Sequence, residues 1–476
     1  MITHYHYNNR LPLRRIRGFL LFIAFLLSLS ALSCVKVEAA PSARYIFLFI
    51  GDGMGIQQRN AAELFLAGAP AGGKHNKEGE SHLVMNSLPA QGILTTQSLS
   101  GITDSAAAAT AIATGKKTSN GRIGMDASGN IKLLSIAKIA KNKGMKVGII
   151  TSSFLQDATP AAFYANAQSR KDFRSIGEQL TNSGFDYFSG GLRGSKAEEK
   201  SGKNILDLAA AKGFILVKHD SDWSYVYPGQ RVLAIPPKLS GGGMPYEIDR
   251  NGKELSLRDY VRRGIQLLNN RDGFFMMVEG GKIDLACHAN DIATTIRETI
   301  AFDESVQEAL AFYKKHPEET LIIVTADHET GGLELNARAA EALKFHTLLS
   351  RQKRSYLAAE GRVGRMKTAT EELFFGLNQM EGDPLSLSKE ELRELSHAWD
   401  LRRKKEVKGY ATYDPLTVTE LRIRDKRVGV SWNTFYHSGK PVAISALGIQ
   451  QNAFSGELDN TDIFSILSGI IHASRQ

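Results

Sequence analysis

Residues 43–55 read ARYIFLFIGDGMG, and this stretch decides the fold class. Its six residues Tyr45–Ile50 are all aromatic or aliphatic, which is typical of a strand that is buried on both faces. The run ends in a glycine-rich turn that contains Asp52. We therefore predict a central strand of a parallel sheet with a carboxylate at its carboxyl end.

Similar apolar runs recur along the chain, and helical patterns separate them. The runs begin at Met145, Gly213, Gly273 and Leu321, and helices are expected over 131–142 and 295–313. Alternation of strands and helices predicts an α/β fold, a three-layer α/β/α sandwich around a central, mostly parallel sheet. The length of 476 residues would allow several domains, but we predict one domain over residues 40–476.

Residues 338–427 differ in composition from the rest of the chain, since they are rich in Lys, Arg and Glu, and they have a helical pattern. They predict a helical, charged insertion near the C-terminal third of the chain. We expect its charges to form a solvated face, and a lid or rim over a site is the alternative.

Polar side chains follow three of the predicted strands directly. Asp52 follows the first strand, Glu279 ends the run GFFMMVE, and Asp327 and His328 follow the run LIIVTA. Ligands of open α/β sheets bind at the carboxyl ends of the strands. We therefore expect these side chains to meet in one crevice, where a buried carboxylate such as Glu279 needs a partner.

Two pairs of residues have spacings that suit a metal ion. Asp284 and His288 are four residues apart, so on a helix they would face the same way, although exposed helix pairs share this spacing. Asp327 and His328 are neighbours and reach one ion only if the chain bends. The glycines at 331 and 332 make such a turn credible.

Residues 103–117, TDSAAAATAIATGKK, place Ser105 at the head of an alanine-rich helix. Thr103 or Asp104 can cap this helix, which leaves Ser105 in the first turn. Free N–H groups and the positive end of the helix dipole favour phosphate there. By themselves, the alanines also fit simple close packing.

Six segments, in chain order, resemble the alkaline phosphatase family over essentially the whole chain after the leader. They are FIGDGMG (49–55), TDSAAAAT (103–110), DATPAAFYANAQSRK (157–171), VEGGKIDLACHAND (278–291), VTADHETGG (324–332) and WNTFYHSG (432–439). Several of them agree with the family at many consecutive positions, which makes the resemblance specific.

The resemblance implies a site for three metal ions. One Zn²⁺ would be bound by Asp284, His288 and His437, and a second Zn²⁺ by Asp52, Asp327 and His328. One Mg²⁺ would be bound by Asp52, Thr159 and Glu279. Imidazole with carboxylate suits zinc, whereas a set made only of oxygen ligands suits magnesium.

The resemblance also implies hydrolysis of phosphate monoesters through a phosphoserine on Ser105, with Arg170 gripping the phosphate. A phosphodiesterase of the same superfamily and a non-catalytic exported protein that binds phosphate or metal are the alternatives. Arg170 favours a dianionic monoester, and Ser105 argues against a pure binder. A sulfatase is disfavoured because DSAAAAT lacks the C/S-x-P-x-R pattern.

Two positions bear on the affinity for phosphate. Relatives often carry Lys or His where this chain has Leu285, so one polar or cationic contact to phosphate is lost. Asp157 is one of two residues common at its position, the other being His. Together they predict a less positive pocket and weaker binding of the phosphate product.

The N-terminus has the pattern of a secretory signal peptide, so we expect a periplasmic or extracellular protein. Arg10, Arg14, Arg15 and Arg17 precede the apolar run at 18–33. VEA before Ala40 suits cleavage after residue 39, whereas ALSC at 31–34 resembles a lipoprotein box, with a leader of 1–33 and a lipid-anchored Cys34. Both alternatives stay open, and an uncleaved anchor is less favoured.

Charge and cysteine content narrow the class of protein further. The net charge is +9, and residues 1–39 carry five basic residues and one acidic residue, so their removal leaves about +5. This mild excess predicts no nucleic-acid binding. Cys34 and Cys287 are the two cysteines, so we expect no disulfide in the mature domain. Members of the family are often dimers, which implies a homodimer as partner.

Overall fold

The computed structural model describes residues 42–69, 82–193, 204–363, 387–407 and 409–473, together with Met1, Thr3 and His4. All helices and strands described below belong to one compact unit, Ser42–Arg475. Apart from Met1, Thr3 and His4, the predicted signal peptide lies outside the described residues, and so does Cys34. Among the described residues, no helix has the length and apolar character needed to cross a membrane.

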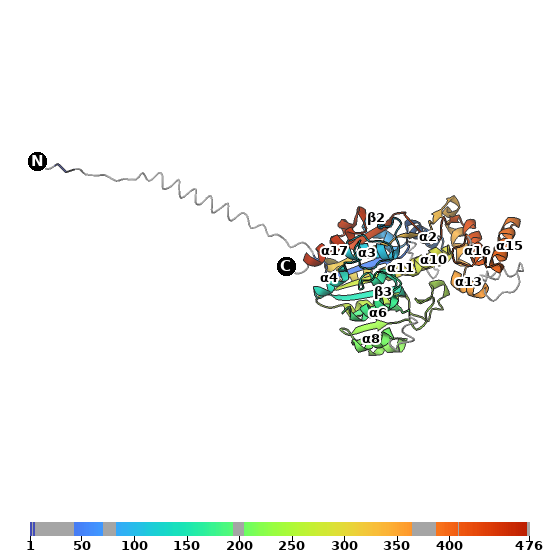
Figure 1. The fold of residues 1–476 in the computed structure, drawn as a ribbon. Coiled ribbons are helices and arrows are strands. Elements are labelled where there is room, and N and C mark those ends of the chain that lie inside the picture. The colour runs from blue at the N-terminus through green and yellow to red at the C-terminus, as the bar shows by residue number, and fades with distance from the viewer. Residues whose placement is uncertain are drawn as a thin grey trace. The chain divides into compact units, whose positions relative to one another are not determined.

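Ten strands of the described chain form one mixed, mostly parallel sheet (Figure 1). In spatial order they are β14 (Gly456–Asp459), β2 (Ala90–Thr95), β13 (Val442–Gly448), β8 (Thr320–Ala326), β1 (Tyr45–Gly51), β7 (Phe274–Glu279), β3 (Lys146–Phe154), β4 (Tyr187–Gly191), β6 (Arg231–Ala234) and β5 (Phe214–Val217). β13 runs antiparallel to both of its neighbours. β1 pairs in parallel with β7 and β8, so its carboxyl end lies beside theirs.

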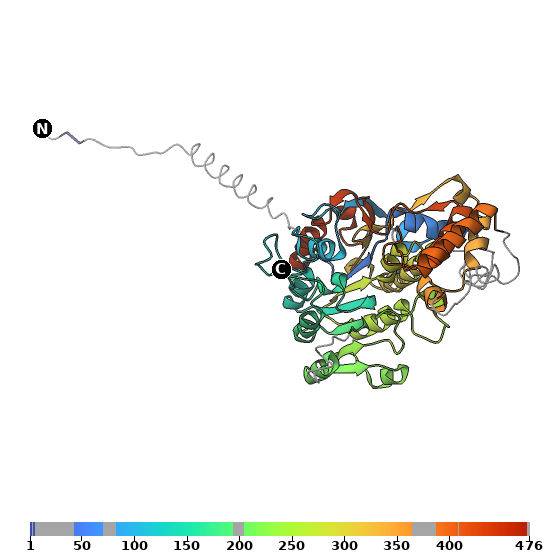
Figure 2. The same cartoon turned by 45° about the vertical axis from the view of Figure 1, so that its right-hand side comes forward.

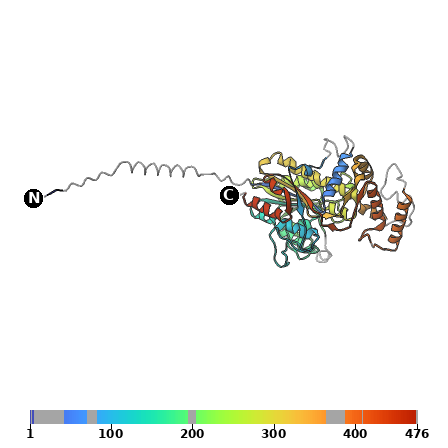
Figure 3. The ribbon, with the colours of Figure 1, turned by 90° about the horizontal axis from the view of Figure 1, so that it is seen from above.

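Helices cover both faces of this sheet, as seen from above in Figure 3. One layer contains α2 (Ile56–Ala67), α9 (Leu257–Leu268), α11 (Ile292–Tyr313) and α12 (Ala342–Ser350), and the other contains α3 (Ser105–Thr114), α4 (Ile136–Asn142), α5 (Ala158–Ala161) and α17 (Asp462–Ala473). Every residue of β1 is buried, because apolar side chains on both of its faces need cover. The predicted three-layer α/β/α sandwich is confirmed.

Further short elements complete the unit. Helices α6 (Phe173–Asn182) and α8 (Ile205–Ala211) contact one another, and α10 (Lys282–His288) follows β7. Two small antiparallel ladders pair β9 (Glu329–Thr330) with β12 (His437–Ser438) and β10 (Glu334–Leu335) with β11 (Val430–Ser431). Short 3-10 helices occupy Val84–Ser87, Asp220–Tyr225, Glu247–Asp249, Pro317–Glu319, Ala337–Ala340 and Gln451–Phe454.

The described part of the charged region 338–427 is mainly helical, as predicted, with α13 (Tyr356–Val363), α15 (Lys389–Arg403) and α16 (Pro415–Arg427) at one end of the unit (Figure 2). The expectation of a solvated face is wrong for part of α16. Arg424 and Asp425 are buried there, and Arg424 Nη1 donates to Gln352 Oε1 at 2.6 Å. Buried charges are stable only when they are paired or hydrogen-bonded, so α16 is tied into the unit by its charges.

The two predicted helices begin at other residues than those expected. The helix expected over 131–142 begins at Ile136, where the Ser135 hydroxyl caps it by accepting from the Lys138 N–H at 3.2 Å. The helix expected over 295–313 begins at Ile292, because the Asp291 carboxylate caps it by accepting from the Thr294 N–H at 3.1 Å. In both cases a polar side chain that satisfies a free N–H decides the start.

Candidate active site

Ser105 is the first residue of α3, and its side chain is buried. Asp104 is the N-cap, and its carboxylate accepts from the Ala107 N–H at 3.0 Å. The Ser105 hydroxyl lies 3.2 Å from Nε2 of His328. All ten residues of α3 are buried, so the alanines let the helix pack closely and present the serine to the strand ends.

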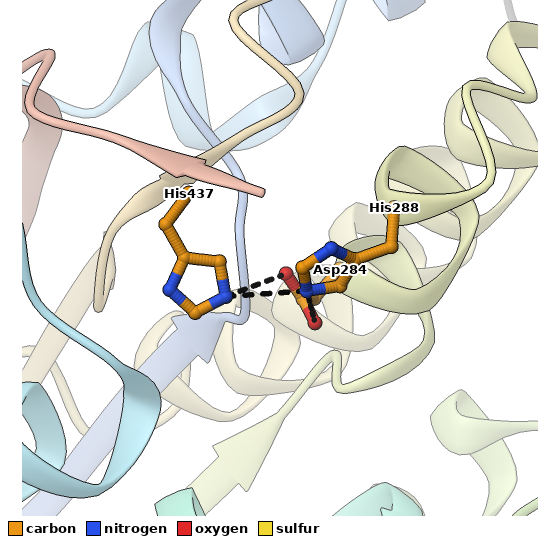
Figure 4. A group of neighbouring side chains, drawn as sticks. All are labelled: Asp284, His288 and His437. Atoms are coloured by element: carbon orange, nitrogen blue, oxygen red, sulfur yellow. Dashed lines mark hydrogen bonds and ion pairs between the residues drawn. The ribbon is translucent and has the colours of Figure 1, made fainter. Parts of the chain in front are cut away.

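A first group of metal-ligating side chains comprises Asp284, His288 and His437 (Figure 4). Asp284 and His288 face the same way from α10, and His437 reaches them from β12. Nε2 of His288 lies 3.2 Å from Nε2 of His437 and 3.2 Å from a carboxylate oxygen of Asp284. Converging nitrogens and oxygens at this spacing suit a shared cation.

A second group takes two of its three residues from the ends of β1 and β8 and the third from α10. Its ligand atoms come from Asp52, Asp284 and His328, so Asp284 belongs to both groups. Nε2 of His328 lies 3.5 Å from Asp52 Oδ1 and 3.3 Å from Asp327 Oδ2. The bend after β8 therefore brings the neighbours Asp327 and His328 to one place, as the turn at 331 and 332 predicted.

Each residue predicted to bind magnesium has one buried oxygen to offer, namely Asp52 Oδ1, Thr159 Oγ1 and Glu279 Oε1. Each is buried, and none has a hydrogen-bond partner within the described part of the chain. Glu279 uses its other carboxylate oxygen to accept from the Thr151 hydroxyl. Because buried oxygens that accept no hydrogen bond are costly, this arrangement fits a hard cation that takes oxygen ligands.

Burial, and then repulsion between neighbouring carboxylates, raise the pKa values of the acidic groups at the strand ends. Burial and the charges of Asp327 and Asp284 raise the pKa of Asp52, while burial and Asp157 raise the pKa of Glu279. Burial and Asp284 raise the pKa of Asp327 to about 7. A bound cation would offset this negative charge, so the electrostatics fit a metal centre.

In the first ligand group the pKa of the carboxylate is lowered rather than raised, because histidines surround it. Burial would raise the pKa of Asp284, but His288 and His437 outweigh it and hold that pKa well below its usual range. In return, Asp284 outweighs the burial of His288 and raises the pKa of His288 to about 9. Asp284 and His288 therefore form an ion pair that a metal ion must break.

Each of the three histidines has its Nδ1 held by a group outside the ligand sets. Nδ1 of His288 lies 2.5 Å from the carbonyl of Phe435, and Nδ1 of His437 lies 2.8 Å from the carbonyl of Thr103. A carbonyl only accepts, so these nitrogens donate and leave Nε2 free to bind a cation. Nδ1 of His328 lies 3.2 Å from the hydroxyl of Thr330.

Thr330, which is buried in β9, is a site residue that the sequence did not predict. Its hydroxyl lies 2.5 Å from Asp284 Oδ1 as well as 3.2 Å from His328 Nδ1, so one side chain joins the two ligand groups. Thr330 stands two residues after His328 in VTADHETGG, but His328 lies in the bend between β8 and β9, so strand periodicity could not have identified Thr330.

Gly53 is a backbone requirement of the site, with a φ of 68° that favours glycine. A Cβ there would stand 2.8 Å from Asp284 Oδ1 and 2.9 Å from the Thr330 hydroxyl. The Gly53 N–H donates to Asp327 Oδ1 at 3.1 Å. The turn after β1 therefore needs a residue without a side chain.

Arg170 lies in a turn rather than on a helix, with its guanidinium held between two carboxylates. Nη1 donates to Asp104 and Nη2 to Asp157, both at 3.2 Å. Asp104 thus caps α3 and orients Arg170, which joins Arg170 to the serine helix. Leu285 follows Asp284 on α10 and is half-buried, so an apolar side chain stands next to a predicted zinc ligand.

A sheet whose strand ends gather carboxylates and imidazoles around a buried serine is the architecture of a metal-dependent enzyme. The chain belongs to the alkaline phosphatase family, whose sequence pattern it matches over residues 43–195 and 184–473. It is a phosphatase by this membership, and the predicted family is confirmed.

Similar proteins of known sequence or structure support the same family assignment. Alkaline phosphatase 3 of Bacillus subtilis is 30% identical over 441 residues, covering 88% of this chain and 87% of that protein. The cold-active alkaline phosphatase of Shewanella sp. superposes with a TM-score of 0.73 and 29% identity, covering 90% of this chain and 99% of that structure. The alkaline phosphatase of Thermus thermophilus superposes with a TM-score of 0.76 and 26% identity, covering 94% of this chain and 95% of that structure.

Proposed function

We propose that this protein hydrolyses phosphate monoesters at a site for two zinc ions and one magnesium ion. The observation that carries the proposal is the Ser105 hydroxyl, 3.2 Å from Nε2 of His328 at the buried start of α3. A pure binder of metal or phosphate has no use for a serine at this point. Family membership supports the same reaction class.

The ligand types support the assignment of the ions. Asp284, His288 and His437 offer nitrogen with oxygen, which suits zinc, as do Asp52, Asp327 and His328. Asp52, Thr159 and Glu279 would hold magnesium, since their free oxygens are those that a hard cation takes. Bound zinc would lower the pKa of the serine hydroxyl and neutralise charge on the leaving oxygen.

Residues of the chain perform the remaining steps. Arg170 donates parallel N–H groups to two phosphate oxygens, in a geometry held by Asp104 and Asp157. Ser105 gives its hydroxyl proton to solvent, attacks phosphorus in line and forms a phosphoserine, while the bond to the alcohol oxygen breaks and that oxygen takes a proton from solvent. Free N–H groups at the start of α3 stabilise the added negative charge. Water then hydrolyses the phosphoserine and releases phosphate.

The experiment compares a nitrophenyl phosphate monoester with the matching diester, using wild type and Ser105→Ala. We expect faster monoester turnover and a loss of several orders of magnitude in the variant, with its metal content retained. Faster turnover of the diester would overturn the assignment. Stripping with chelator and restoring zinc, magnesium or calcium, singly and together, would identify the ions that support activity.

The cellular location and the oligomeric state are parts of the same proposal. The basic cluster before the apolar run at 18–33 supports export to the periplasm or outside the cell, with membrane attachment through Cys34 as the lipoprotein alternative. A homodimer is proposed by analogy with the family alone. Fractionation of cells that express the full chain would test export.

A further inference from the structure

The side chain of Asn290 joins the end of α10 to the loop that precedes β12. Asn290 is fully buried and has a left-handed backbone with φ of 54°. Its Nδ2 donates to the carbonyl of Cys287 and to the carbonyl of Thr434, each at 3.0 Å. One amide therefore connects the helix that carries His288 with the loop that leads to His437.

Arg422 of α16 completes the hydrogen bonding of this amide. Its Nε and Nη2 donate to Asn290 Oδ1 at 3.2 and 2.7 Å. The oxygen has two lone pairs, and Arg422 fills both. Without the guanidinium, a fully buried amide oxygen would lose its only partners within the described residues, which favours movement of Asn290.

The same guanidinium packs on the ring of Phe435, 4.4 Å from its centroid. Tyr413 stacks on that ring with centroids 5.8 Å apart and an interplanar angle of 24°. The carbonyl of Phe435 is the acceptor for His288 Nδ1 at 2.5 Å. Packing on the ring therefore restrains the backbone that sets the tautomer of His288.

We propose that Arg422 is a positioning residue for the first ligand group, acting on His288 and His437 through Asn290 and Phe435. The inference rests on the proposed function, in which this group binds zinc. The helical region after residue 338 then does more than form a rim over the site, because α16 holds residues that position His288 and His437.

The effect should be selective for one of the two zinc sites. His328 takes its Nδ1 contact from Thr330 in β9, and none of the hydrogen bonds of Arg422 described above reaches it. Loss of a group that orients a metal ligand typically weakens metal binding by about 10- to 100-fold. We expect a loss of that size in one zinc-binding step and little change in the other.

The experiment measures both zinc affinities of the metal-stripped full chain against a competing chelator. Arg422→Met keeps an unbranched apolar stem and removes the guanidinium, whereas Arg422→Lys keeps the charge but not the two-donor fork. Lys426→Met is the matched control, because Lys426 is exposed on the same helix and pairs with Glu394 at 3.4 Å. Thermal melts and circular dichroism report folding.

We expect Arg422→Met to weaken one step 10- to 100-fold, Arg422→Lys to weaken it less, and Lys426→Met to match wild type. Unchanged affinities in a folded Arg422→Met protein, or equal losses at both sites, would overturn the inference while wild-type hydrolysis leaves the proposed function intact. If Arg422→Met does not fold, the same comparison in Arg422→Lys decides. A wild type that binds no zinc would refute both.

Discussion

The hydroxyl of Thr330 lies 2.5 Å from Oδ1 of Asp284, so it links the first ligand group to β9. Asp284 is held ionised by His288 and His437, so it only accepts, and the hydroxyl must donate to it. Thr330 is then left to accept from Nδ1 of His328. One hydroxyl thus orients a ligand of each predicted zinc ion.

Thr330→Val should therefore weaken both zinc sites while preserving the shape of the core. Valine replaces the hydroxyl by a methyl group, and a hydrogen bond to a charged group contributes about 1.5–3 kcal/mol, or roughly tenfold to a hundredfold in affinity. Thr330→Ser keeps the hydroxyl and serves as the control. Chelator competition measures both, and equal zinc affinities in the valine variant and wild type would contradict the bridging role.

Gly53→Ala should disrupt the metal centre more than backbone strain alone explains. The added Cβ would press on Asp284 and Thr330 at under 3 Å. Gly213→Ala is the control, since Gly213 has a similar φ of 81° but nothing within 4 Å of a Cβ. We expect comparable losses of unfolding free energy, about 1 kcal/mol, from the strain in both variants. Zinc content after dialysis should fall in Gly53→Ala only.

Zinc binding should strengthen as pH rises from 7 to 9. Asp284 raises the pKa of His288 to about 9 from an ordinary 6.5, so the metal-free protein holds a proton that zinc must displace. Displacement of one proton gives about a tenfold rise in apparent affinity per pH unit. The same ion pair stabilises the metal-free fold fully below pH 6.5 and is lost as pH rises through about 9.

A metal indicator calibrated at each pH would measure this affinity, and proton release can be followed in weakly buffered solution. An affinity that stays flat between pH 7 and 9 would show that His288 is already neutral without metal.

Leu285→Lys should tighten inhibition by inorganic phosphate. An ammonium group near the predicted phosphate position adds attraction that the apolar side chain lacks, and about 1.4 kcal/mol corresponds to tenfold. Leu285→Met keeps the site apolar and serves as the control. Competitive inhibition constants measure the effect, and a constant for wild type that already equals that of the lysine variant would defeat the expectation of weak product binding.

Local patterns were sufficient to predict the strands around Tyr45–Ile50 and Phe274–Glu279, because short apolar runs that are rich in aromatic and aliphatic residues and end at glycines are typical of strands buried on both faces. The i, i+4 spacing of Asp284 and His288 predicted one helix face, and α10 has that geometry. The choice of Asp104 over Thr103 as the cap of α3 was open until side-chain positions were known. Short strands such as β9 and β12 have too few residues to show a period.

The sequence by itself determined the family, the α/β class and the set of candidate ligands, because these depend on residue type and local spacing. Only the tertiary structure decided that Thr330 joins two ligand groups, that Arg170 stands between Asp104 and Asp157, and that Arg422 reaches Asn290. Apart from the contact between Thr330 and His328, these contacts join residues 13 to 132 positions apart in the chain. They arise from packing between distant segments, for which no local periodicity exists.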